Sequence, residues 1–201
     1  MVILEKMRFP SKWRKWISFC VSIVRFSVLI NGEPAGFFSS SRGLRQGDPL
    51  SPLLFILVME ALSKLVLKAV EEGFLDGVHI SNSRSEGVLI SHLLFADDTL
   101  FFCKPNENNF GYLKRILLIF EAMSGLRVNL AKSVIIPIGE VPNVNALAQF
   151  FGCKVDYLPS SYLGLPLGAS YKSKAVWDPL VERFHKRLAG WKAKLLSGGV
   201  D

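Results

Sequence analysis

Two adjacent carboxylates, Asp97 and Asp98, separate two short apolar runs and could bind a divalent metal ion. The runs, residues 88–94 and 99–103, have the length of strands, so residues 95–98 (FADD) predict a tight hairpin turn with both acids at its tip. Neighbouring carboxylates repel each other unless water or a cation compensates them. Mg²⁺ accepts a few carboxylates completed by substrate phosphates and water, which suits phosphoryl transfer. A solvated β-turn is the simpler alternative for the same residues.

The loop over residues 42–52 is the second segment whose residue types suggest a ligand. Gly43 and Gly47 lie beside Arg45 and Gln46 just before a predicted helix, where bare backbone lets a flat or anionic ligand come close. A rigid loop that only caps the helix explains the same composition. The loop is therefore a candidate for substrate binding, with that structural alternative open.

Hydrophobic periodicity and turn residues predict the elements that position these segments. Ser51 is expected to cap a helix with Pro52 in its first turn, and Gly73 to end it. The apolar window 50–70 is interpreted as a buried helix, because charged residues interrupt it well short of the roughly 20 apolar residues that a bilayer requires. The other predicted elements are a helix over 11–23, a hairpin of 26–30 and 37–41 with Asn31, Gly32 and Gly36 as its turn residues, a polar loop around 81–86, the acidic hairpin, a helix over 108–124, a strand within 128–138, a bent strand over 158–168 and a last helix with Asp178 as N-cap and Pro179 inside it. This order argues for an α+β domain with an antiparallel sheet.

Four segments, in this order, resemble the motifs of reverse transcriptases. Residues 42–52 (RGLRQGDPLSP) resemble motif B, and residues 95–98 resemble motif C in the FADD form that is common in non-LTR retrotransposons. Residues 124–133 resemble motif D, and residues 162–168 resemble the motif E region that grips the primer end. The tail from Arg187 onward is similar to the start of the thumb in plant LINE-type elements. The resemblance covers about residues 9–199.

The resemblance implies a right-hand polymerase palm over residues 1–170, incomplete at its N-terminal side, and the start of a thumb helix over residues 171–201. It also implies RNA-directed DNA polymerase activity in the full-length parent. An RNA template, a DNA primer and deoxynucleotides would then be the partners, and Mg²⁺, or Mn²⁺, the cofactor. A group II intron maturase shares this core, but the FADD form and the tail favour the LINE-type interpretation.

Carried over by the resemblance, Asp97 ligates the catalytic metal ions and Asp98 supports the site. Lys132 is expected near the departing pyrophosphate, where a cation neutralises charge or donates a proton, and a surface lysine is the alternative. The expected substrate contacts are Arg45, Gln46 and Gly47 beneath the incoming nucleotide and template base, and Tyr162, Leu163 and Gly164 at the primer end. Tyr162 is explained equally well as a core residue.

Motif A of this family supplies a further metal-binding aspartate on a strand before the segment that matches here at residues 9–13. Eight residues precede that segment, and none is an aspartate. We therefore expect the 201-residue chain alone not to polymerise, because the second side of a two-metal clamp has no ligand. Primer extension on an RNA template tests this expectation. A non-catalytic nucleic-acid-binding relic is the alternative, and an in-frame upstream sequence encoding the aspartate would argue against it.

The formal net charge of +7 is concentrated at the two ends of the chain. Residues 1–45 carry a charge of +6, residues 46–171 carry −3 and residues 172–201 carry +4. Basic ends suit contact with nucleic-acid phosphates, although solvated helix faces give the same pattern.

Cysteine and histidine usage indicates no further site. The three cysteines lie far apart without metal-ligand spacing, and the N-terminus does not have the pattern of a signal peptide. These features favour a reducing intracellular compartment, cytoplasmic or nuclear. His79, His92 and His185 also lack ligand spacing and are interpreted as structural. A palm without its first strand is expected to expose apolar edge surface.

Overall fold

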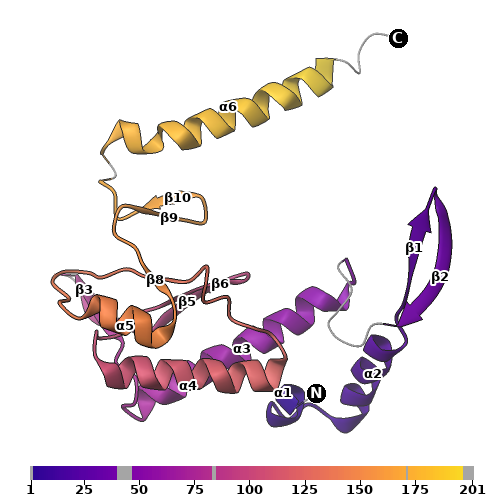
Figure 1. Ribbon diagram of the computed structural model, residues 1–201, viewed down its shortest axis with the longest axis horizontal. Helices are drawn as coiled ribbons and strands as arrows, with labels where there is room; N and C mark the ends of the chain where they lie inside the picture. The colour runs from indigo at the N-terminus through magenta and orange to yellow at the C-terminus, as the bar shows by residue number, and fades with distance from the viewer. Residues whose placement is uncertain (1, 40–46, 83–84, 171, 197–201) are drawn as a thin grey trace. The chain divides into compact units, whose positions relative to one another are not determined.

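The computed structural model describes residues 2–39, 47–82, 85–170 and 172–196 (Figure 1). The chain divides into two compact units, Met1–Asn129 and Leu130–Asp201, each with buried apolar residues of its own. Helices and small sheets make up both units, and four of the five strand pairings in the described part are antiparallel. The predicted mixture of helices and small antiparallel sheets is confirmed.

The first unit alternates helices with three antiparallel hairpins, β1–β2, β3–β4 and β5–β6. Its elements are α1 (Val2–Lys6), α2 (Ser11–Ser22), β1 (Arg25–Ile30), β2 (Glu33–Ser39), α3 (Leu50–Glu71), β3 (Val78–Asn82), β4 (Ser85–Ile90), β5 (His92–Phe95), β6 (Asp98–Phe101) and α4 (Glu107–Ser124). The strand predicted over residues 88–94 is thus divided at Ser91 between β4 and β5. The polar loop predicted around residues 81–86 is shorter than expected, because strand pairing continues into it from both sides.

Hairpin β1–β2 turns at Asn31 and Gly32, as predicted. Both residues have positive φ (53° and 88°), the conformation of a type I′ turn. Strand β2 begins at Glu33, earlier than the predicted residue 37, so Gly36 lies inside the strand and its predicted place in the turn was wrong. The side chains of Leu29 and Phe37 are 68% and 74% exposed. Hairpin β1–β2 thus presents apolar surface, while the apolar edge expected from a missing palm strand stays a prediction.

Helix α3 begins before the predicted cap. Pro49 precedes the first helical residue, and the Asp48 carboxylate accepts a 2.8 Å hydrogen bond from the Leu50 backbone N–H. Ser51 lies inside the helix, so its prediction as N-cap was wrong. Gly73 (φ 73°) follows the helix end as predicted.

The burial of α3 is only partial. Its C-terminal half buries Leu62, Val66 and Ala69, whereas Leu53 and Ile56 near its start are exposed. The prediction of a buried helix over residues 50–70 was wrong for the N-terminal half. No helix in the described part of the chain combines the length and apolarity that crossing a bilayer requires.

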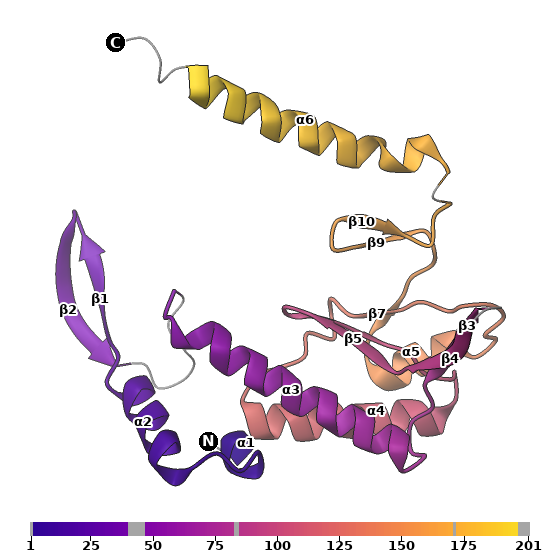
Figure 2. The same ribbon diagram turned by 180° about the vertical axis from the view of Figure 1, so that it is seen from behind.

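Helix α4 supplies much of the core of the first unit. The Asn106 side chain caps it by accepting a 2.8 Å hydrogen bond from the Asn109 backbone N–H, and Gly125 (φ 76°) ends it as predicted. The helix packs against α3 and α1 (Figure 2). Its buried residues are Asn109, Phe110, Leu113, Ile116, Leu117 and Phe120. The apolar stripe predicted for residues 108–124 is confirmed, with one polar residue, Asn109, on it.

The second unit is built around a helix that the sequence analysis did not predict. Its elements are β7 (Val134–Ile135), α5 (Val144–Phe151), β8 (Lys154–Val155), β9 (Ser160–Tyr162), β10 (Leu165–Leu167) and α6 (Lys174–Leu196). Helix α5 buries Val144, Leu147, Ala148 and Phe151 beside the parallel pair β7–β8. Strands β9 and β10 form the bend predicted within residues 158–168.

Helix α6 starts four residues before the predicted N-cap, Asp178. It runs through Pro179, at the loss of one backbone hydrogen bond, and continues to Leu196. Proline is favoured in the first turn of a helix, which is why the predicted start was at Asp178, but in α6 helical turns lie on both sides of Pro179. The exposed side chains of α6 include Val181, Phe184 and Arg187.

Candidate active site

The acidic pair lies at the end of a short, regular hairpin. Strands β5 and β6 pair from His92 opposite Phe101 to Phe95 opposite Asp98, which leaves Ala96 and Asp97 as a two-residue turn. Ala96 has a φ of 49°, a conformation common at the first turn position of hairpins and costly for a residue with a Cβ. The predicted tight turn is present with Asp97 in it, whereas Asp98 is the first residue of β6 rather than part of the turn. Both aspartates are exposed.

The two faces of this hairpin differ. Directly paired residues lie on the same face of a sheet, so Asp98 shares its face with Phe95. His92 lies on the opposite face, where its Nε2 is 2.9 Å from Oγ of Ser63 on α3. The strand alternation therefore directs Asp98 to the face that α3 does not occupy.

His92 ties the hairpin to the helix layer. Its Nδ1 lies 3.0 Å from Ser91 Oγ, so both ring nitrogens have a hydroxyl partner. Burial lowers the pKa of His92 below its ordinary value, and the charge of Glu60 opposes this effect. This half-buried ring is an anchor between β5 and α3, in line with the structural role expected from the sequence.

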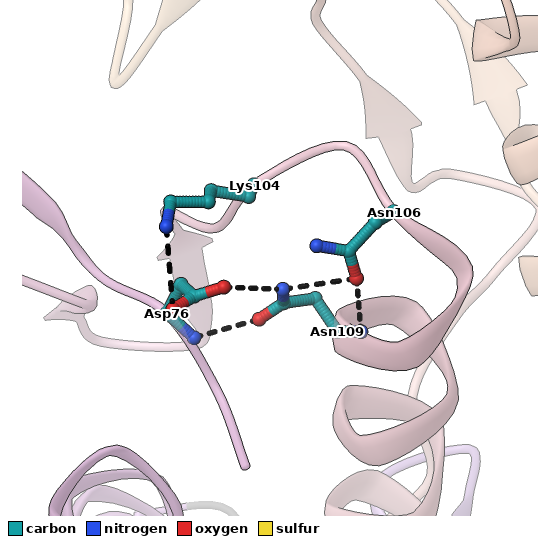
Figure 3. Close-up of polar contacts among 4 residues, drawn as sticks. All are labelled: Asp76, Lys104, Asn106 and Asn109. Carbon is teal, nitrogen blue, oxygen red and sulfur yellow. Dashed lines mark hydrogen bonds and ion pairs between the residues drawn. The ribbon is translucent and has the colours of Figure 1, made fainter. Parts of the chain in front are cut away.

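A second polar cluster holds the base of the same segment (Figure 3). The Asn109 side chain accepts a 2.7 Å hydrogen bond from the Asp76 backbone N–H, and its Nδ2 donates to Asp76 Oδ2 at 2.9 Å. The same Nδ2 donates to Asn106 Oδ1 at 3.0 Å. Lys104 Nζ lies 3.5 Å from Asp76 Oδ1. These four residues join the entrance of β3 to the start of α4.

The charges of this cluster follow from its contacts. The hydrogen bond from Asn109, together with the Lys104 ammonium, lowers the pKa of the Asp76 carboxyl. Burial, with a smaller effect of the Asp76 charge, raises the pKa of the neighbouring Cys103 thiol to about 11. Cys103 is therefore a protonated, inert packing residue at neutral pH.

Sequence reasoning missed this polar cluster, although one signal for it was present. Asn109 lies four residues before Leu113 and seven before Ile116, on the buried stripe of α4. A polar residue on an otherwise apolar helix face must find hydrogen-bond partners when it is buried. That position alone indicated a partner elsewhere in the chain, but not that the partner was Asp76.

The oxygen donors at the turn suit a hard divalent cation. Asp97 and Asp98 offer carboxylates open to solvent, and Mg²⁺ binds one or two such groups while phosphates and water complete its shell. Within residues 2–39, 47–82, 85–170 and 172–196, no group of three or more His, Cys, Asp or Glu side chains could hold a metal ion. Two carboxylates do not form a closed protein cage, so substrate oxygens and water would have to complete the shell of a cation bound at the turn.

The other predicted site residues lie apart from this turn in the sequence. Arg45 and Gln46 fall outside the described residues, and Gly47 is described with a φ of 84° and open space where a Cβ would stand. Lys132 is exposed in the turn before β7 of the second unit. Its spatial relation to the acidic pair stays a prediction.

The remaining predicted residues form the turn of β9–β10. Tyr162 pairs with Leu165, which leaves Leu163 and Gly164 as a two-residue turn. Both have positive φ (53° and 77°), as a type I′ turn requires. The structure thus brings Tyr162, Leu163 and Gly164 together in one hairpin, with Tyr162 half-buried and the turn exposed.

Residues 1–167 match the family model described as "Reverse transcriptase (RNA-dependent DNA polymerase)". The chain belongs to the reverse transcriptase family. This match covers both the acidic hairpin and the β9–β10 hairpin. The family predicted from the motifs is confirmed.

Similar proteins place this reverse transcriptase chain among the relatives of retrotransposon polyproteins. It is 32% identical over 115 residues to the retrovirus-related Pol polyprotein from the type-1 retrotransposable element R2 of Nasonia vitripennis. It is 29% identical over 143 residues to the corresponding polyprotein from the type-2 element R2DM of Drosophila melanogaster. R2 elements are non-LTR retrotransposons. The relatives thus belong to the class that the FADD form of motif C predicted.

A plant protein is more similar over a shorter stretch. An uncharacterized mitochondrial protein of Arabidopsis thaliana is 58% identical over 71 residues, which is 35% of this chain and 56% of that protein.

The alignments with the two Pol polyproteins cover 56% and 71% of this chain but only 10% and 12% of the polyproteins. The reverse transcriptase chain thus spans about a tenth of the polyproteins that it matches.

Proposed function

We propose that this chain supplies the palm region, over residues 1–170, and the start of the thumb, over residues 171–201, of an RNA-directed DNA polymerase of a LINE-type retrotransposon. The observation that carries the proposal is the pair Asp97 and Asp98 at the tip of the β5–β6 hairpin, in a chain that the reverse transcriptase family matches over residues 1–167. Synthesis of DNA on an RNA template would take place inside the cell, in the cytoplasm or the nucleus.

The proposed reaction is attack of a primer 3′-hydroxyl on the α-phosphate of a deoxynucleotide, with pyrophosphate leaving. Asp97 would hold the catalytic Mg²⁺, or Mn²⁺, and Asp98 would support the site. A bound divalent cation supplies positive charge that stabilises the transferring phosphoryl group and the leaving oxygen. Because Asp98 is on the hairpin face that α3 leaves open, substrate oxygens can approach it from solvent.

The remaining roles are proposed from the family resemblance, with support from local structure. Gly47 has positive φ and no side chain, so its backbone can come close to a nucleotide base. Arg45 and Gln46 are proposed to contact the incoming nucleotide and the template base beside it. Lys132 is exposed and can reach an anion such as pyrophosphate. The exposed turn of Leu163 and Gly164, beside Tyr162, is the proposed support for the primer end.

A chimeric polyprotein tests the proposal in a complete enzyme. Residues 1–167 of this chain replace the matching part of the Nasonia vitripennis R2 polyprotein, and primer extension is measured on an RNA template with Mg²⁺. The chimera is expected to make DNA, and the chimera with Asp97→Asn to make none. A chimera with Glu107→Gln, an exposed acid on α4, controls for the loss of one negative charge. DNA synthesis that survives Asp97→Asn would refute the proposed role of the turn.

A nucleic-acid-binding relic without catalysis is the second candidate, and the net charge of +7 favours it. Such a protein would bind an RNA–DNA hybrid with an affinity that falls steeply with salt. Asp97→Asn would leave this binding unchanged or strengthen it, because it removes a negative charge near phosphates. Binding of this kind by the 201-residue chain, with no DNA made by the chimera, would favour the relic.

A further inference from the structure

The acidic turn lies in the segment that connects α3 to α4. The chain departs after α3, at Asp76, forms the hairpins β3–β4 and β5–β6, and comes back at Lys104 to begin α4. Asp76 and Asn109 are 33 residues apart in sequence and in direct contact. The polar cluster of Figure 3 therefore joins the start and the end of the segment that connects α3 to α4.

Asn109 fixes the orientation of this contact through two hydrogen bonds to Asp76. Its side chain is only 4% exposed, and its amide uses both the carbonyl oxygen and the nitrogen on Asp76. Apolar contacts tolerate small slides, whereas a two-point hydrogen-bonded contact to backbone and side chain of one residue fixes both separation and orientation. Two residues near the start of α4 add to this contact: Asn106 accepts a hydrogen bond from the Asn109 amide, and the Lys104 ammonium pairs with the Asp76 carboxylate.

The hairpin beyond this base has few means of fixing its own position. An isolated two-stranded hairpin is marginally stable, and β5–β6 consists of four residue pairs extended by one bond from Phe102 N–H to Ser91 O. Asp98 lies five residues from Cys103, about 17 Å along an extended strand. A tilt of roughly 5° at the base would move the turn by about 1.5 Å at that reach, a displacement large enough to spoil a phosphoryl-transfer geometry.

We propose that Asn109, acting through Asp76, is a positioning residue that fixes the acidic turn of Asp97 and Asp98 against helices α3 and α4. The inference rests on the proposed function, since it gives the positioned turn a metal ion to hold. The His92–Ser63 contact is the second attachment, at the first residue pair of the hairpin. Together the two attachments define where the turn stands, and Asn109 controls the one at the base.

The test uses the 201-residue chain and two readouts. The variant Asn109→Asp keeps the shape of the side chain, removes the donor to Asp76 and sets two carboxylates against each other. Hydrogen exchange of the β5–β6 amides is expected to become roughly tenfold faster, because a buried polar contact is lost. The dissociation constant for Mn²⁺, measured by water-proton relaxation, is expected to rise roughly tenfold, as for partners that orient metal ligands.

Three variants separate positioning from a general loss of stability. Asn108→Asp makes the same chemical change at the exposed neighbouring position and is expected to alter neither readout. Val66→Ala removes buried volume from α3 without touching the cluster, and at a matched thermal midpoint it is expected to leave Mn²⁺ affinity in place. The reciprocal double variant Asp76→Asn with Asn109→Asp restores one donor and one acceptor, and it is expected to recover most of both readouts.

The outcomes decide the two proposals separately. Hairpin exchange in Asn109→Asp equal to that in Asn108→Asp, or Mn²⁺ affinity lost equally in Val66→Ala, would overturn the positioning role. Absence of Mn²⁺ binding that depends on Asp97 would instead refute the metal site, and hydrogen exchange would still decide the positioning role. If Asn109→Asp does not fold, Asp76→Ala, which removes the acceptor of the hydrogen bond from Asn109 Nδ2, gives the comparison from the other side of the contact.

Discussion

Phe95 and Asp98 face each other as the last cross-strand pair of the β5–β6 hairpin. This pairing leaves Ala96 and Asp97 alone in the turn and puts Asp98 on the face opposite the His92–Ser63 contact. Asp97 belongs to the turn and does not follow the strand alternation. The two adjacent acids are thus held by different constraints, one by strand register and the other by turn conformation.

Replacement of Asp97 is expected to separate metal binding from folding. Asp97→Asn removes a carboxylate from the turn, so the 201-residue chain should lose Mn²⁺ binding measured by water-proton relaxation, and Asp98→Asn should weaken it less. Because both aspartates are exposed, the free energy of unfolding should change by less than about 0.5 kcal/mol. Glu140→Gln, an exposed acid in the second unit, is the matched control. Unchanged Mn²⁺ affinity in Asp97→Asn would contradict the assigned site.

The positive φ of Ala96 gives a prediction for the turn itself. Ala96→Val places a β-branched side chain at a φ of 49° and should destabilise the hairpin by about 1–2 kcal/mol. Ala96→Gly relieves the strain but increases the entropy of the unfolded chain, so it should stay within about 0.5 kcal/mol of the parent. Urea unfolding with hydrogen exchange at β5–β6 measures both. Equal stability of the valine and glycine variants would contradict the turn conformation.

The acidic hairpin and α4 were predictable because their signals are local. Two apolar runs around FADD determine a hairpin, and the apolar spacing ending at Gly125 determines the helix. Helix α5 escaped prediction because two turns of helix are too short to show a clear period. The parallel pairing of β7 with β8 depends on contacts across the α5 connection, which no local pattern encodes.

The site was predictable in part for a related reason. The pattern around Asp97 and Asp98 predicted the turn, because the residues that form it are neighbours in the sequence. Its metal chemistry stays a prediction. The contact between Asp76 and Asn109 spans 33 residues, and neither residue belongs to a recognisable motif. Similarly, Ser51 was preferred as the cap of α3 because serine before proline is a common start, whereas the carboxylate of Asp48 reaches the helix first.

Stability is expected to fall with His92 protonation as the pH drops below about 6.5. Its pKa in the folded chain is lowered by burial from an ordinary value of 6.5, so the folded state binds a proton less readily than the unfolded state. The resulting stability is complete above pH 6.5 and is lost as pH falls through the folded pKa. Thermal midpoints should therefore fall more in the parent than in His92→Gln over this window. His79→Gln controls for the loss of an imidazole at an exposed position.

Gly168 is expected to be more sensitive to substitution than Gly139, although both have positive φ (74° and 78°). A Cβ on Gly168 would stand 2.6–2.8 Å from atoms of the Leu158 side chain, whereas a Cβ on Gly139 would meet no atom within 4 Å. Gly139→Ala should cost about 1 kcal/mol through backbone strain. Gly168→Ala should cost about 1–3 kcal/mol more because the side chain must move. Denaturant unfolding of the chain measures the difference, and equal losses would contradict the close approach.

The pairing of Phe95 with Asp98 also constrains how copies of such an element can diverge. Gain or loss of a single codon within β5 or β6 would exchange the two faces beyond it and turn the acid at position 98 toward α3. A change of two codons would preserve the parity of the strand. Insertions and deletions of one codon should therefore be rarer within the FADD hairpin than in surface connections when related sequences are compared.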